Sequence, residues 1–211
     1  MRRAAAVAAA LPTAALVKLA VAPDPLLVAW DLDGTLINHK RGRVPDADHV
    51  FDERYSLYLR PHAGAVLRVL GAARNEQVLF TAATRPYADS IVNALLPPGV
   101  FSRRLYREEL SASTHGKDLA RLGAPLARVL LVDDQQRNRV GAQHFLLVEP
   151  YRIGDAADVT LWGVAALVLL HNVIGPAAFD FAHWLSPRAP APRLLPAGGG
   201  GEKPRGAPQL A

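Results

Sequence analysis

The chain has 211 residues, half of them hydrophobic, which is enough for one well-buried domain. It contains no cysteine, which excludes disulfides, thiolate metal sites and cysteine nucleophiles. The formal net charge of +5 lies in the two ends, because residues 24–185 are close to neutral, and we therefore expect no direct binding of nucleic acid.

The two ends differ in composition from the rest of the chain. Residues 1–23 are rich in alanine and free of acids, which is typical of an organelle transit peptide or of a disordered start. Pro12 and Lys18 interrupt the apolar run, so the sequence gives no convincing transmembrane segment there. Residues 186–211 are rich in proline and glycine, and we expect them to be disordered. Residues 24–185 remain as the one folded domain.

Between the ends, short apolar runs of strand length alternate with longer stretches of helical period. This is the pattern of an α/β domain with a parallel sheet. The predicted strands are 26–30, 78–80, 104–106, 129–132 and 145–148. The predicted helices lie near 63–74, 86–95, 116–122 and 159–173.

Polar residues follow three of the predicted strands. Asp31 and Asp33 come after the first strand and Thr81 after the second, while Asp133 and Asp134 come after the fourth. The carboxyl ends of parallel strands lie at one edge of the sheet, where open α/β sheets bind ligands. We therefore expect these side chains to converge.

The first of these motifs is VAWDLDGTL, which carries two carboxylates two residues apart. One carboxylate can attack phosphorus as a nucleophile, while the other moves the proton of the leaving oxygen and then of water. Asp31 would be the nucleophile and Asp33 the acid and base, and Gly34 permits an unusual turn between them and the next strand. The alternative is an ordinary acidic turn after a strand.

Three further positions fit phosphoryl chemistry. Thr81 offers a hydroxyl that can donate to a phosphoryl oxygen, although threonine there also caps helices. Lys117 offers an ammonium group, and at a predicted helix start it opposes the macrodipole. Asp133 and Asp134 repel each other unless a cation lies between them, and Mg²⁺ takes carboxylate oxygens as ligands.

In this order, DLDGT, FTAAT, Lys117 and VDD resemble the haloacid dehalogenase superfamily. More narrowly, RPHAGAVLRVL, LFTAATRPYAD, LYREEL, KDLARLG and VLLVDDQ are similar to the phosphatases of the RNA polymerase II carboxy-terminal tail and their small relatives, over roughly residues 26–173. The resemblance implies a haloacid-dehalogenase-like Rossmannoid three-layer sandwich with a central parallel sheet, a short insert and no large cap.

The resemblance also implies a Mg²⁺-dependent phosphoserine or phosphothreonine protein phosphatase that acts through an aspartyl-phosphate. A phosphorylated protein would be its substrate. It implies that Asp31 is the nucleophile and Asp33 the acid and base, and that Thr81 and Lys117 bind the phosphate. It also implies that Mg²⁺ is held by Asp31, by the backbone carbonyl of Asp33 and by Asp134. Thr35 and Asp133 would have supporting roles, and Asp133 would orient Lys117.

Two features depart from the narrower family. Gly34 stands where that family usually has Glu or another residue. The insert at 38–59 is shorter than the substrate-reading insert of the small tail phosphatases, so peptide selectivity does not carry over. An insert of this length is too short to seal the site, which favours a protruding phosphorylated side chain as substrate. Arg41, Arg43 and Arg54 either contact acidic or phosphorylated residues next to it or form a solvated hairpin.

Two other functions are compatible with the same domain. One is a presequence-binding subunit like that of the mitochondrial inner-membrane translocase, which the transit-like start favours. The full set of acids and the lack of a convincing span favour the phosphatase instead. The other is a metabolite phosphatase, which the short insert disfavours. We expect a nuclear or cytoplasmic location, with the mitochondrion as the alternative, and the sequence leaves the oligomeric state open.

Overall fold

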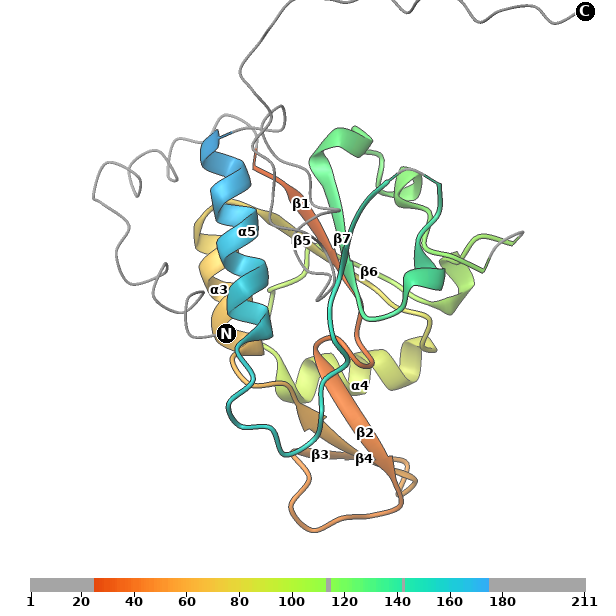
Figure 1. Ribbon diagram of the computed structural model, residues 1–211. Coiled ribbons are helices and arrows are strands. Elements are labelled where there is room, and N and C mark those ends of the chain that lie inside the picture. Colours follow the sequence, from red (N-terminus) through yellow and green to blue (C-terminus); the bar gives the residue numbers. More distant parts are fainter. Residues whose placement is uncertain (1–24, 113–114, 142, 175–211) are drawn as a thin grey trace, which may run out of the picture.

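The computed structural model describes residues 25–112, 115–141 and 143–174 (Figure 1). The predicted transit-like or disordered start at 1–23 and the predicted disordered tail at 186–211 lie outside these residues. Within the described part of the chain, no helix combines the length and the apolar character needed to cross a membrane.

A five-stranded sheet forms the centre of the domain, in the order β6-β5-β1-β7-β8. All of its neighbouring strands are parallel, and Trp30 lies between Leu79 of β5 and Val132 of β7. This confirms the predicted parallel sheet, with strand bounds within one residue or two of those expected. The strands are β1 (Leu27–Trp30), β5 (Glu76–Phe80), β6 (Arg103–Leu105), β7 (Val129–Asp133) and β8 (His144–Leu147).

Alternating side chains of β1 belong to two cores, one on each face of the sheet. Val28 and Trp30 pack into the larger core, and Leu27 and Ala29 pack into the smaller one. Three helices contribute to the larger core, and α3 and α5 run side by side in Figure 1. These helices are α3 (Ala63–Ala72), α4 (Arg85–Leu95) and α5 (Thr160–Ile174).

Leu119 and Leu122 of one short 3₁₀ turn pack into the smaller core, and here the predicted helix at 116–122 is wrong. Only η2 (Leu119–Leu122) is helical, and it is a 3₁₀ turn whose Ala120 N–H donates to the Asp118 side chain at 3.0 Å. The Lys117 N–H instead donates to the carbonyl of Asn138 at 2.8 Å in an isolated parallel bridge. The lysine therefore enters the site from extended backbone. The other 3₁₀ turns are η1 (Arg107–Glu109), η3 (Leu126–Arg128) and η4 (Gln136–Asn138).

The insert is a small antiparallel sheet of its own, in the order β2-β4-β3. It packs on α4, where His49 Nε2 lies 2.9 Å from Ser90 Oγ and the Phe51 ring meets the Tyr87 ring edge-on at 5.2 Å. The insert is short and forms no large cap, as the resemblance implied. Its strands are β2 (Ile37–Arg41), β3 (His49–Phe51) and β4 (Tyr55–Leu59).

Candidate active site

The polar residues predicted at the strand ends come together at one edge of the sheet. Asp31 follows β1 and its N–H donates to the Val132 carbonyl at 2.9 Å, while Thr81 follows β5. Asp133 is the last residue of β7, and Asp134 comes next. The structure thus brings together side chains that are as much as a hundred residues apart in sequence.

Lys117 lies at the centre of the site, between two carboxylates. Its Nζ donates to Asp31 Oδ1 at 2.5 Å and to Asp133 Oδ2 at 2.6 Å, and the side chain is fully buried. Burial alone would lower the pKa of Lys117, but the charges of Asp31 and Asp133 outweigh it and raise the pKa above its ordinary value. The two carboxylates therefore favour the charged form of the buried Lys117 ammonium.

Asp133 has its hydrogen-bonding capacity filled. Asn138 Nδ2 donates to both of its carboxylate oxygens at 2.9 Å, and the Gln135 N–H donates to Oδ1 at 2.7 Å. Gln143 then fixes the lysine backbone, because its Nε2 donates to the Lys117 carbonyl at 2.9 Å. Sequence reasoning missed Asn138 and Gln143, because a buried amide has no motif of its own.

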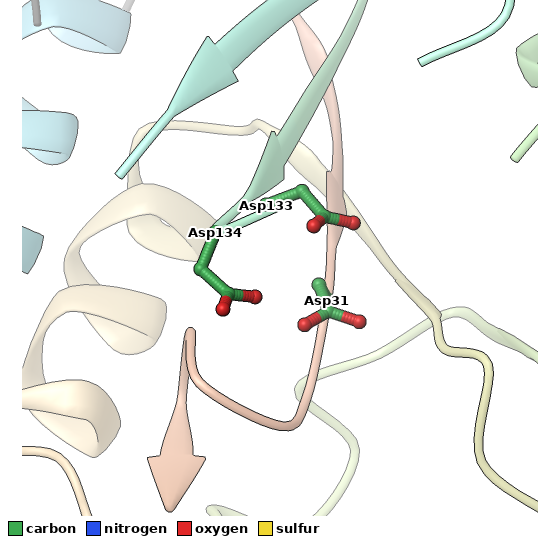
Figure 2. A group of neighbouring side chains, drawn as sticks. All are labelled: Asp31, Asp133 and Asp134. Atoms are coloured by element: carbon green, nitrogen blue, oxygen red, sulfur yellow. The ribbon is translucent and has the colours of Figure 1, made fainter. Parts of the chain in front are cut away.

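The remaining acids fit a divalent cation. Carboxylate oxygens of Asp31, Asp133 and Asp134 lie within 4.8 Å of one another at the ends of β1 and β7 (Figure 2). Since Asp133 is already engaged, Asp31 and Asp134 are the available ligands, and Asp134 Oδ1 is buried without a hydrogen-bond partner in the described chain. Burial raises the pKa of Asp31 to about 7 and, with Asp133 as the next cause, that of Asp134 to about 6. The site holds more carboxylate than one lysine compensates, which suits Mg²⁺.

Gly34 leaves the space that Asp134 occupies. Its φ is +86°, a left-handed conformation that favours glycine, and a Cβ there would overlap the Asp134 carboxylate and lie 2.6 Å from its Cγ. The Glu that the narrower family usually has at this position would not fit this arrangement. Gly34, which departs from the narrower family, thus allows the position of Asp134, an expected metal ligand.

Asp33 faces the pocket and is oriented from outside its own loop. The Tyr87 hydroxyl, from α4, donates to Asp33 Oδ1 at 2.7 Å, and His39 Nδ1, from β2, lies 3.4 Å from the same oxygen. The Asp33 carboxylate raises the pKa of His39 above its ordinary value. Tyr87 lies in the LFTAATRPYAD phrase, but sequence reasoning assigned it no role.

The two threonines have different surroundings. Thr81 Oγ1 accepts from the Ala83 N–H at 3.0 Å, which leaves its proton free to donate toward the pocket that it lines. Thr35 is fully buried beneath the site, and its hydroxyl has no hydrogen-bond partner among the described residues. Its carbonyl accepts from Arg60 at 3.1 Å, so the loop after β1 is held from below by a residue that sequence reasoning missed.

These groups open into a cavity of about 380 Å³. Asp31, Asp33 and Thr81 line it, whereas the other predicted site residues do not. The arginines of the insert do not line it either. Arg43 pairs with Glu53 and Arg54 with Asp52, which agrees with the alternative of a solvated hairpin. The remaining lining residues are His39, Phe51, Tyr55, Ala82, Ala83, Thr84, Tyr87, Arg107, Gln135, Arg137 and Asn138.

The fold and the order of the groups at its edge define a haloacid-dehalogenase-like phosphatase domain. Acids follow the first strand, a hydroxyl follows β5, and a lysine and a second acidic pair complete the site. Residues 26–173 match the family of NLI interacting factor-like phosphatases, and the chain belongs to this family.

Relatives and solved structures agree with this assignment. The chain is 35% identical over 126 residues to the human carboxy-terminal domain RNA polymerase II polypeptide A small phosphatase 1, covering 56% of this chain and 48% of that protein. It is 30% identical over 176 residues to nuclear envelope morphology protein 1 of Schizosaccharomyces pombe, covering 72% of this chain and 37% of that protein. The chain thus spans less than half the length of either relative.

The fold has a counterpart among solved structures. That of Fcp1, described as an essential RNA polymerase II CTD phosphatase, superposes with a TM-score of 0.52 at 20% identity. The superposition covers 69% of this chain and 47% of that one. At this identity the likeness supports the fold alone.

Proposed function

We propose that the chain is a Mg²⁺-dependent protein phosphatase that removes phosphoryl groups from serine or threonine through an aspartyl-phosphate on Asp31. The observation that carries the proposal is that Asp31 and Asp33 line one pocket while Lys117 contacts Asp31 from its buried side. Membership of a phosphatase family supports the same reaction.

The two aspartates divide the reaction between them. An Asp31 carboxylate oxygen attacks phosphorus, the bond from phosphorus to the seryl or threonyl oxygen breaks, and Asp33 gives that oxygen its proton. Asp33 then takes a proton from a water whose oxygen attacks phosphorus, the bond to Asp31 breaks, and inorganic phosphate leaves. The hydrogen bond from Tyr87 holds Asp33 in place for both proton transfers.

The phosphoryl oxygens meet fixed charge and a hydroxyl donor. Thr81 presents its hydroxyl to the pocket, and the Lys117 ammonium beside Asp31 balances charge as the phosphoryl group arrives. Asp31, the backbone carbonyl of Asp33 and Asp134 would hold Mg²⁺, which supplies Lewis-acid polarisation of the phosphoryl group when bound. Asp133 fixes Lys117 through its own hydrogen bonds.

The pocket favours a protein substrate over a small metabolite. The insert packs on α4 and supplies Phe51 and Tyr55 to one wall, next to Tyr87. An aromatic wall of this kind suits an apolar residue beside the phosphorylated one. The relatives compared above support a phosphatase, and the translocase alternative finds no support in them.

Hydrolysis of a phosphoserine peptide by the full chain tests the proposal. We expect release of phosphate in Mg²⁺, none in excess EDTA, and none from Asp31→Asn, because an amide is a poor nucleophile. Asp52→Asn is the matched control, since Asp52 is exposed in the insert and pairs only with Arg54 there. Full activity in EDTA would remove the metal from the proposal.

A further inference from the structure

We infer that Arg107 and Arg137 form a second anion-binding subsite at the wall of the catalytic pocket. This subsite selects phosphorylated residues that have an acidic or a second phosphorylated residue close by in the same peptide. The inference rests on the proposed function, because it assigns the substrate class of that same site. It replaces the insert as the source of cations, since Arg41, Arg43 and Arg54 do not line the pocket and the last two pair with acids of their own hairpin.

Arg107 is fixed to the loop that carries the predicted phosphate ligand. Its backbone N–H donates to the Ala83 carbonyl at 3.0 Å and its Nε donates to the Ala82 carbonyl at 2.9 Å, so the side chain lies directly beside the turn after Thr81. The residue is exposed and lines the pocket. Within the described residues its terminal guanidinium nitrogens have no acidic partner.

Arg137 reaches the pocket from the turn after β7. This turn, η4, is held against the site because Asn138 donates to both oxygens of Asp133 and the Gln135 N–H donates to one of them. Arg137 is exposed and lines the pocket, and the described part of the chain offers it no ion pair or hydrogen-bond partner. A free, exposed arginine on a turn this well fixed is placed to bind a ligand.

The charge balance of the pocket favours an anion at this point. The buried cation, Lys117, is shared by two carboxylates, so it contributes little positive field to the pocket mouth. Arg107 and Arg137 are the only lysine or arginine residues among those described that line the cavity. A guanidinium fork binds carboxylate and phosphate alike, so both sources of negative charge fit.

Peptide selectivity measured on the full chain tests the subsite. A phosphoserine peptide series carries a single Glu, phosphoserine, Lys or Ala at each neighbouring position in turn. We expect kcat/KM to be about 2- to 5-fold higher for the best Glu or phosphoserine peptide than for its Ala counterpart, the range that exposed ion pairs support. The preference should shrink as salt rises from about 0.1 M to about 1 M, because screening shortens the reach of exposed charges from about 10 Å to about 3 Å.

Charge reversal shows which residue causes the preference. Arg137→Glu should abolish the preference for the acidic peptide and favour the Lys peptide, whereas Arg137→Lys should keep the preference for the acidic peptide. Arg68 is exposed on α3 and does not line the pocket, so Arg68→Glu should leave the preference unchanged. The same preference in Arg137→Glu as in the unmodified protein, or no preference in the unmodified protein, would overturn the subsite.

A binding arm keeps this test separate from catalysis. Fluorescence anisotropy of the same labelled peptides on Asp31→Asn reports their relative affinities without turnover. If no peptide is hydrolysed yet the acidic ones bind more tightly through Arg137, the subsite stands and the proposed reaction fails. If all peptides are hydrolysed and bound alike, the reaction stands and the subsite fails.

Discussion

Asp133 and Asp134 are neighbours in the chain but have opposite surroundings. Asp133 is fully buried and accepts hydrogen bonds from Lys117, Asn138 and the Gln135 N–H. Asp134 is half-buried, and its Oδ1 has no partner in the described chain. In an acidic turn with no catalytic role, the two carboxylates would have similar surroundings. Single substitutions at Asp133 and Asp134 therefore distinguish their proposed roles.

Asparagine at each position should give different kinetic defects. Asp134→Asn keeps one carbonyl oxygen, so we expect measurable activity with a higher Mg²⁺ requirement. Asp133→Asn loses the charge and turns an amide toward groups that are all donors, so we expect a loss of about 10²-fold in kcat at any Mg²⁺ concentration. Initial rates against Mg²⁺ concentration check both, and equal losses or the reverse order would contradict the assigned roles.

The raised pKa values of the acidic cluster would make binding of the proposed Mg²⁺ depend on pH. The pKa of Asp31 is about 7 and that of Asp134 about 6 in the folded protein, against 3.8 ordinarily. Between about pH 4 and about pH 7 these two carboxyl groups bind more protons in the folded state than in the unfolded state. The metal-free protein therefore loses stability as pH rises through this range. Mg²⁺ at the proposed site would compensate the ionised carboxylates and offset that loss.

We therefore expect Mg²⁺ to raise Tm more at about pH 8 than at about pH 5, where the proton competes for the same oxygens. Thermal melts with and without Mg²⁺ at each pH check this. The difference in Tm between melts with and without Mg²⁺ at one pH cancels the contribution of groups remote from the site. His171, whose pKa is lowered by burial, is one such group. A Tm increase that is the same at both pH values would contradict the assignment of these acids as ligands.

At the scale of the elements, the loop between β1 and β2 sets the geometry of the site. Gly34 in this loop and Gly42 after β2 have nearly the same φ, +86° and +85°. A Cβ at Gly34 would overlap the Asp134 carboxylate, whereas a Cβ at Gly42 has nothing within 4 Å. Substitutions at these two glycines therefore distinguish the effect of backbone strain from the effect of losing the space that Asp134 occupies.

Alanine should cost stability at both positions and function at only one. Gly34→Ala and Gly42→Ala each place a side chain in left-handed backbone, at a cost of about 1–2 kcal/mol. Gly34→Ala should in addition displace Asp134, so we expect weaker Mg²⁺ binding and a loss of activity that Gly42→Ala does not show. Urea unfolding and Mg²⁺ titration of both variants check this, and equal activities would show that Gly34 does not define the site.

The elements that carried the site could be predicted in part. Asp31, Thr81 and Asp133 were found because an apolar run followed by a polar residue is a local pattern, and parallel strands put their ends together. Lys117 was found on the wrong element, because its backbone pairs with the turn after Asp133, and nothing local reports such a pairing. Tyr87 was missed because its contact with Asp33 joins residues 54 positions apart, and Asn138 was missed because a buried amide has no motif of its own.

The insert shows a second limit of local patterns. β2 carries exposed polar residues along most of its length, so it lacks the apolar alternation that marks a strand. It becomes a strand through its pairing with β4, which in turn pairs with β3. Sequence reasoning therefore gave the right size for the insert but not its sheet.

Across the whole molecule, Arg60 joins the site to the rest of the fold. Its side chain is 1% exposed, and its guanidinium donates to the Thr35 carbonyl at 3.1 Å, the Glu149 carbonyl at 2.9 Å and the Asp158 carboxylate at 2.9 Å. It thus ties the loop after β1 to the segment after β8 and to the start of α5, where Asp158 also accepts from the Thr160 N–H.

Removing this arginine should destabilise the whole domain. Arg60→Met leaves Asp158 buried without its partner, so we expect a loss of about 3–5 kcal/mol in the free energy of unfolding. Arg60→Met with Asp158→Asn removes the unpaired charge and should recover part of that loss. Urea unfolding checks both, and a single variant as stable as the unmodified protein would show that Arg60 does not hold the fold together.

The central claim is that Asp31 carries the phosphoryl group during turnover, and acid quenching of the reaction tests it most directly. The full chain is mixed with a phosphoserine peptide in Mg²⁺, quenched in acid and digested, and the peptide that contains Asp31 is examined by mass spectrometry. We predict a phosphoryl adduct on Asp31 that hydroxylamine removes, as expected for an acyl phosphate, and no adduct or turnover in Asp31→Asn. Turnover by Asp31→Asn at the rate of the unmodified protein would contradict the covalent mechanism.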